Sequence, residues 1–170
     1  RNGKIVDGDK IIATLAVDMK KKNTLLLFLC LFSLWAVAQE KKPVKIACVG
    51  NSITYGSGIK NQFQNSYPGL LSQLLGEGYD VRNFGISARV LLNKGDHPYM
   101  HEQKFRDLLA FQPDIVTIKL GTNDSKPWNW RYGKDFKKDL TEMLDILQEL
   151  PSKPKIYLCL PVPAVKRNFG

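Results

Sequence analysis

Residues 45–58 read KIACVGNSITYGSG, and this stretch decides the fold. Its first five residues are mostly apolar, which is typical of a strand buried on both faces of a parallel sheet. Gly50 ends the run and Ser52 follows at once, at the place where open α/β sheets form their ligand crevices. Glycine at this point allows a sharp turn and the close approach of a substrate. We therefore interpret Ser52 as a candidate nucleophile.

Two other interpretations of this stretch stand beside the nucleophile. Glycine and serine are common in strand-to-helix loops for turn geometry alone. A glycine-rich loop can also cradle a phosphate group. However, the stretch contains neither the G-x-x-x-x-G-K-[ST] pattern of a P-loop nor the G-x-G-x-x-G pattern of dinucleotide-binding proteins. The choice between turn and nucleophile depends on the rest of the chain.

Strand and helix patterns alternate after the Ser52 loop. Short apolar runs predict strands at residues 79–84, 114–120 and 154–160. Helical periodicity predicts helices at residues 69–75, 96–111 and 135–150, while residues 62–66 are expected to form a polar connection. This order predicts an α/β fold with a doubly wound parallel sheet, a flavodoxin-like three-layer arrangement with strand order 2-1-3-4.

Three strand ends carry residues suited to acyl transfer. Because the carboxyl ends of parallel strands lie along one edge, Ser52, Gly85 and Asn123 are expected to meet there. The backbone N–H groups of Ser52 and Gly85 and the side-chain amide of Asn123 would form an oxyanion hole. Glycine leaves room for the acyl group, and asparagine donates hydrogen bonds without carrying charge.

These residues resemble the sequence blocks of the SGNH (GDSL-type) hydrolases. The matching segments are residues 50–54 (GNSIT), Gly85 and residues 121–124 (GTND). The longer segment LGTNDSKP, with Asn129 and Trp130, resembles the branch of sialate O-acetylesterases and related carbohydrate esterases.

The resemblance implies a serine esterase that needs no metal and no cofactor and that often removes acetyl groups from sugars. It implies that Ser52 attacks the ester while Gly85 and Asn123 hold the oxyanion, and that Asp124 braces its own loop. Trp130, with Trp128, would either offer a flat face to a sugar ring or cover the core.

The sequence departs from the family pattern at two points. Asn51 replaces the usual aspartate of G-D-S, and its side-chain oxygen is still expected to brace the loop. The D-x-x-H block that supplies the family's catalytic base is absent. The two histidines, His97 and His101, precede the third block, so a surface role is expected in preference to a displaced base. A metal pair is also disfavoured, because Pro98 stands where H-E-x-x-H requires glutamate.

The amino end has the features of a secretion signal. Residues 19–38 combine a basic start, an apolar run of about 13 residues and the small residues of Ala36-Val37-Ala38. The run is short for a membrane span, which needs about 20 residues. We expect residues 1–18 to be an untranslated leader, residues 19–38 to be removed, and residues 39–170 to form a secreted or periplasmic domain without a stable membrane anchor.

The charge distribution and the cysteines allow two further predictions, one about nucleic-acid binding and one about disulfides. The net charge is +9, but beyond residue 38 its 19 basic and 13 acidic residues are interspersed, which argues against nucleic-acid binding. Cys48 and Cys159 lie in predicted strands with a third strand between them, beyond disulfide reach. Both are therefore expected to be buried free thiols.

The carboxyl end leaves two hypotheses open. Residue 170 comes shortly after the fourth predicted strand, and we expect the catalytic Asp and His of the family to follow beyond it, the chain being truncated. The first hypothesis is a secreted esterase that acts on an acylated carbohydrate or another small ester. The second is a non-catalytic SGNH-like module that binds a glycan or a protein partner through the same crevice.

Overall fold

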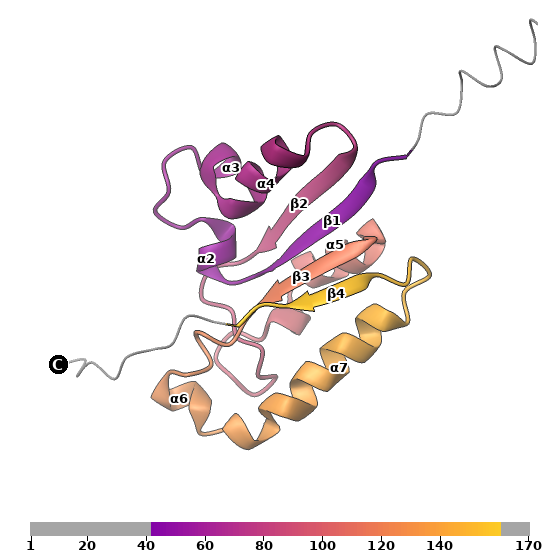
Figure 1. Cartoon of the computed structure of the whole chain (residues 1–170). Helices are drawn as coiled ribbons and strands as arrows, with labels where there is room; N and C mark the ends of the chain where they lie inside the picture. Colours follow the sequence, from indigo (N-terminus) through magenta and orange to yellow (C-terminus); the bar gives the residue numbers. More distant parts are fainter. Residues whose placement is uncertain (1–41, 161–170) are drawn as a thin grey trace, which may run out of the picture. The chain divides into compact units, whose positions relative to one another are not determined.

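A parallel sheet lies at the centre of the computed structural model, which describes residues 42–160 (Figure 1). Its strands in this part of the chain are β1 (Val44–Gly50), β2 (Tyr79–Gly85), β3 (Ile115–Lys119) and β4 (Lys155–Leu158), in the order β2-β1-β3-β4. Every neighbouring pair is parallel. The predicted doubly wound sheet and its strand order are therefore confirmed. The predicted leader and signal segment lie outside the described residues.

Helices cover both faces of the sheet. α3 (Gln62–Asn65) and α4 (Tyr67–Leu75) lie on one face, and α5 (Gln103–Phe111) and α7 (Phe136–Gln148) lie on the other (Figure 1). The main hydrophobic cluster lies between the sheet and α5 and α7, where Val49, Leu108 and Met143 are completely buried. None of the helices within residues 42–160 is long and apolar enough to cross a membrane.

The predicted helix at residues 96–111 is wrong in its first half. α5 begins only at Gln103, after a single 3-10 turn, Tyr99–His101. Pro98 is extended, with ψ 126°, and a proline also disfavours helical geometry in the residue before it. The backbone of this segment pairs instead with Val90, which donates to His97 O at 3.0 Å and accepts from Tyr99 N at 2.9 Å.

The predicted connection at residues 62–66 also differs. Residues 62–65 form the helical turn α3, and two further four-residue helices, α2 (Ser52–Tyr55) and α6 (Pro127–Trp130), were not predicted. Each is too short to show the apolar periodicity on which helix prediction depends.

Both cysteines of the described region are free, but only one is buried. Cys48 lies in the central strand β1, and burial raises the pKa of its thiol. Cys159 is exposed, so the prediction of two buried thiols is wrong for this residue. Cys159 lies just beyond β4, one of the two edge strands of the described sheet, where Leu158 is also 52% exposed.

Candidate active site

Ser52 is the first residue of α2 and follows β1 after one intervening residue. It is half-buried, whereas its neighbour Asn51 is buried. The side-chain oxygen of Asn51 accepts a hydrogen bond from Ile53 N at 3.1 Å, which caps α2. Asn51 thus braces the loop as predicted, since the brace needs an acceptor oxygen and not a charge. A side chain at Gly50 would collide with Thr54 and come within 2.8 Å of the Lys119 carbonyl oxygen.

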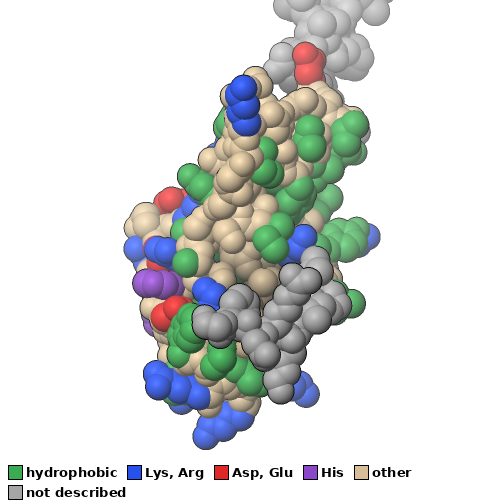
Figure 2. All heavy atoms as spheres, turned by 90° about the vertical axis from the view of Figure 1, so that its left-hand side faces the viewer, with side chains coloured by type: hydrophobic (Ala, Val, Ile, Leu, Met, Phe, Trp, Pro, Cys, Tyr) green, Lys and Arg blue, Asp and Glu red, His purple; other side chains and the backbone are tan. Residues whose placement is uncertain are grey.

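The three predicted strand ends lie at one level of the sheet. Gly50 is in register with Gly85 on one side and with Lys119, the last residue of β3, on the other. The loops that carry Ser52 and Asn123 therefore start from adjacent strands, and Gly85 lies beside the first of them. Figure 2 looks onto this face of the molecule, where hydrophobic side chains gather along one flank.

Gly85 has a structural reason to be glycine that the sequence did not reveal. A Cβ atom here would lie 2.8 Å from Thr54 C and 2.9 Å from Tyr55 Cα, both in the backbone of α2. The N–H of Gly85 donates to the side-chain oxygen of Asn83 at 2.9 Å. The absent side chain therefore allows α2, and with it Ser52, to pack against the end of β2.

The turn that follows Gly85 carries a second unusual backbone position. Ala88 has a φ of 67°, a left-handed conformation that is uncommon outside glycine. Among the described residues, the backbone N–H groups of Ser87, Ala88 and Arg89 have no acceptor. The Ser87 hydroxyl lies 2.6 Å from the Ser57 hydroxyl, which joins this turn to the loop after α2. The left-handed conformation of Ala88 could not be predicted from the sequence, because alanine is not a typical residue for this conformation.

Asn123 is half-buried in the loop after β3 and contacts the same turn. Its side-chain N–H₂ group donates to Arg89 O at 3.0 Å, which leaves its second N–H available. Gly121 precedes it with a φ of 111°, a conformation that favours glycine.

Asp124 braces more than its own loop. One oxygen of its fully buried carboxylate accepts hydrogen bonds from Leu91 N and Leu92 N, both at 2.8 Å. Burial raises the pKa of Asp124, although hydrogen bonds from backbone N–H groups oppose the shift. The segment after β2 and the loop after β3 are thereby tied together around Asn123.

Asn129 is a second buried brace of the Asn123 loop. Its side chain, 1% exposed, donates to Asn123 O at 3.0 Å and to Asp96 Oδ1 at 3.1 Å, and it accepts from Asp96 N at 2.9 Å. Burial acts to raise the pKa of Asp96, but hydrogen bonds from Trp128 and Asn129 outweigh it and hold that pKa below its usual value. This role could not be inferred from the sequence, since Asn129 stands between two tryptophans in a four-residue helix.

Trp128 and Trp130 are both on the surface. Their exposed fractions are 54% and 53%. The Trp128 ring N–H donates to Asp96 at 3.1 Å, and the Trp130 ring packs 6.1 Å from that of Phe136. Each tryptophan is therefore anchored along one side and open on another, so neither serves only as cover for the core.

The two histidines are exposed, as expected for surface residues, and histidine is visible on the face shown in Figure 2. Within residues 42–160, no three side chains of histidine, cysteine, aspartate or glutamate come together in a way that could hold a metal ion.

The protein has a three-layer α/β fold in which a serine follows the first strand. This serine lies beside a glycine and a loop that carries an asparagine, and this arrangement defines the class of SGNH-type folds. Solved structures share this fold. Est24, a carbohydrate acetylesterase from Sinorhizobium meliloti, matches with a TM-score of 0.54 and 21% identity over 68% of this chain and 62% of its own. The SGNH-hydrolase family esterase AlinE4 matches with a TM-score of 0.51 and 23% identity over 71% of this chain and 60% of its own.

The sequence comparisons place the chain in a particular family. It belongs to the GDSL-like lipase/acylhydrolase family, whose profile matches residues 48–170. It is also 48% identical over 150 residues to an acetylxylan esterase from Xylanibacter ruminicola. That match covers 78% of this chain but 31% of the relative, so the chain spans about a third of the length of the curated protein.

Proposed function

We propose that the protein is a carboxylic ester hydrolase that removes acyl groups, above all O-acetyl groups, from carbohydrate, with Ser52 as the nucleophile. The observation that carries this proposal is the position of Ser52 at the start of α2, level with the ends of β2 and β3. Family membership supports the ester chemistry. An acetylated sugar is the proposed substrate because the proteins similar to this chain include an acetylxylan esterase and a carbohydrate acetylesterase.

In the proposed reaction, the Ser52 oxygen attacks the carbonyl carbon of the acetyl ester and loses its proton to a general base. The sugar oxygen leaves with a proton, and water then releases acetate from the acyl-enzyme. The proposed base is a histidine beyond residue 170, in the D-x-x-H block that the family resemblance implies. We do not assign this role to His97 or His101, because the family resemblance places the base after the third sequence block.

The developing oxyanion needs donors, and the structure suggests where they come from. The first candidate is the second N–H of the Asn123 amide, which has no acceptor in the described part of the chain. The N–H of Gly85, the donor expected from the sequence, is bonded to Asn83 in this structure. We therefore add the N–H groups of Ser87, Ala88 and Arg89, which have no acceptor within residues 42–160. A left-handed residue within a turn can aim successive N–H groups at one anion.

The surface beside Asn123 suits a sugar. Trp130, and Trp128 next to it, expose about half of their side chains at the end of the Asn123 loop. We propose that Trp130 packs against a sugar ring of the substrate, since a flat aromatic face can cover the C–H face of such a ring. Secretion or periplasmic location of the enzyme belongs to the same proposal and depends on the signal pattern of residues 19–38.

The test is acetate release from acetylated xylan and from 4-nitrophenyl acetate by the full-length protein. Ser52→Ala is expected to lower kcat by about 10⁶-fold, and Asn123→Ala by about 10²–10³-fold. Wild-type rates in the Ser52→Ala variant would remove this residue from the mechanism. If the wild-type protein released no acetate but bound the polysaccharide, the alternative of a non-catalytic binding module would replace the esterase.

A further inference from the structure

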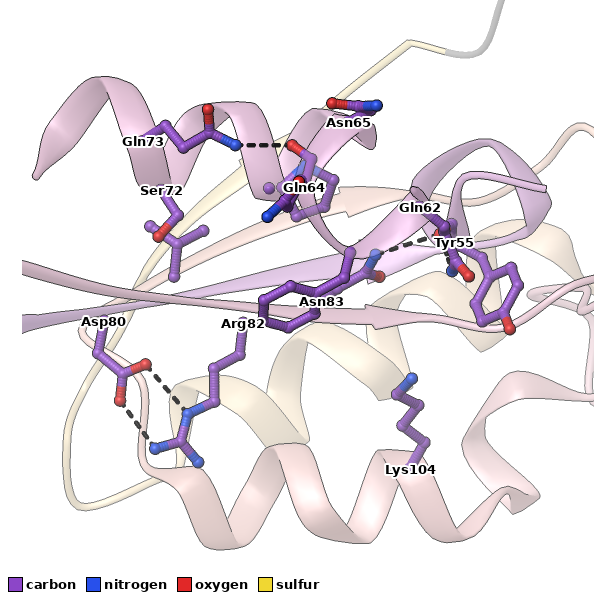
Figure 3. A pocket seen from close by; sticks show the side chains of 14 residues that line it. Tyr55, Gln62, Gln64, Asn65, Ser72, Gln73, Asp80, Arg82, Asn83 and Lys104 are labelled. Carbon is purple, nitrogen blue, oxygen red and sulfur yellow. Dashed lines mark hydrogen bonds and ion pairs between the residues drawn. The ribbon is translucent and has the colours of Figure 1, made fainter. Parts of the chain in front are cut away.

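A groove of about 920 Å³, lined by both polar and apolar side chains, lies along the outer edge of β2, away from β1 (Figure 3). α3 and α4 form one wall, and Lys104 of α5 points toward it from the other side of the strand. Five side-chain amides line it: Gln62, Gln64, Asn65, Gln73 and Asn83. The volume lies within the range of about 300–1,000 Å³ that is usual for ligand pockets.

The amides of the α3–α4 wall are oriented by hydrogen bonds to the backbone. The N–H₂ group of Gln73 donates to Gln64 O at 2.9 Å, that of Asn65 donates to Lys60 O at 2.7 Å, and that of Gln62 donates to Tyr55 O. The amide oxygens of these three side chains have no donor among the described residues. Because one hydrogen bond orients each amide group, its oxygen can accept a hydrogen bond from an O–H donor.

Aromatic side chains accompany the amides. Phe63 of α3 is 93% exposed, and Tyr55 of α2 is 38% exposed. An almost fully exposed phenylalanine contributes little to the core. Its ring is therefore available to pack against the apolar face of a ligand in the groove. Sugar rings combine such a C–H face with a rim of hydroxyl groups.

The charged side chains that line the groove are Asp80, Arg82 and Lys104, and each already has a partner within the described residues. Asp80 is paired with Arg82 at 2.8 Å, so a ligand would meet mainly the amides and the aromatic rings. The Lys104 amine donates to Gly85 O at 3.3 Å, and burial lowers its pKa, a sign that its charge is poorly solvated there.

One end of the groove lies against the loops of the candidate active site. Tyr55 ends α2, the helix that Ser52 begins. The Asn83 side chain donates to Thr54 O at 3.0 Å and accepts from the Gly85 N–H. A chain of sugars that lies in the groove would therefore reach the end of β2, beside Ser52.

We propose that this groove binds neutral sugar units that flank the acetylated sugar of a polysaccharide substrate. The proposal rests on the proposed function for its link to catalysis, but binding in the groove can be measured without catalysis. It accounts for the amide oxygens, the exposed phenylalanine and the position of the groove beside Ser52.

The decisive variant is Phe63→Ala combined with Gln73→Ala, because both side chains are exposed, both line the groove, and Gln73 supplies one of the oriented amide oxygens. The matched control is Gln148→Ala, an exposed glutamine at the end of α7. Titration calorimetry in a Ser52→Ala background measures the affinity for deacetylated xylohexaose. The double variant is expected to raise Kd about tenfold, equivalent to about 1.4 kcal/mol, whereas the control leaves Kd unchanged.

Kinetics on two substrates complete the test. With acetylated xylan, the double variant is expected to lower kcat/KM about tenfold, while hydrolysis of 4-nitrophenyl acetate stays at the wild-type rate because this small ester does not reach the groove. Unchanged hexasaccharide affinity, or an equal loss with both esters, would overturn the groove as a sugar site. An extended peptide that binds along β2 while the hexasaccharide does not bind would overturn it as well. If the protein had no esterase activity but still bound the saccharide through these residues, the groove would be supported as a sugar site and the proposed reaction would be rejected.

Discussion

The packing of α2 against β2 makes Gly85→Ala an informative substitution. The added methyl carbon would lie 2.8 Å from Thr54 C and 2.9 Å from Tyr55 Cα, whereas carbon atoms are comfortable at about 3.5–4.0 Å. Both neighbours are backbone atoms, so no side chain can rotate away. α2 must therefore shift by about 1 Å.

Two measurable effects follow from this shift. Overpacking of this kind typically costs about 1–3 kcal/mol of unfolding free energy, which corresponds to a decrease in Tm of about 4–12 °C for a domain of this size. Since α2 begins with Ser52, a displacement of about 1 Å is also expected to lower kcat by about 10²-fold. Thermal unfolding followed by circular dichroism and hydrolysis of 4-nitrophenyl acetate measure the two effects independently.

The matched control is Gly78→Ala, which lies immediately before the same strand. No atom lies within 4 Å of a Cβ built there, and this glycine has no left-handed backbone. The Tm of the Gly78→Ala variant is expected to stay within about 2 °C of the wild-type value, as for an ordinary surface substitution. If Gly85→Ala and Gly78→Ala unfolded at the same temperature, the steric argument for α2 would be refuted.

Three further predictions concern the braces and the thiols. Because burial raises the pKa of Asp124 above 3.8, the folded protein binds this proton more tightly than the unfolded chain, and the stability contribution of Asp124 decreases as the pH rises above that value. Asp124→Asn should flatten this part of the stability profile in urea titrations between pH 4 and 7, and an unchanged slope would contradict the assignment. Asn129→Ala should destabilise the fold by about 1–3 kcal/mol and lower kcat more than it raises KM; equal kcat in the variant would show that its contact with Asn123 O does not position the site. Cys159→Ser should remove one fast-reacting thiol in a titration of the native protein with Ellman's reagent, while Cys48→Ser should remove none, since Cys48 is buried.

The sequence was informative wherever a residue type reports on its own surroundings. The apolar run before Gly50 indicated the central strand, and the alternation of patterns indicated the parallel sheet with its order. Asn51 was correctly expected to brace its loop, because a short amide side chain can reach a backbone N–H two residues away. These inferences involve contacts that are close in the sequence or a periodicity that repeats along it.

The same reasoning failed where distant segments meet. Residues 96–98 were predicted to be helical, but proline geometry and pairing with Val90 keep them extended. Cys159 was predicted to be buried, but it is exposed just after β4, an edge strand of the described sheet. The sequence also did not reveal that α2 packs against Gly85, where a Cβ atom would meet the backbone of Thr54 and Tyr55.

The sequence by itself determined the strand order, the serine after the first strand and the family. Only the tertiary structure revealed that Asp124 and Asn129 hold the Asn123 loop, that Asn83 occupies the Gly85 N–H, and that amides from α3 and α4 line a groove beside β2. The physical reason is that hydrogen bonds between loops depend on the spatial neighbours of each group. Local propensity does not specify those neighbours, because they are set when the strands pair and the helices pack on the sheet.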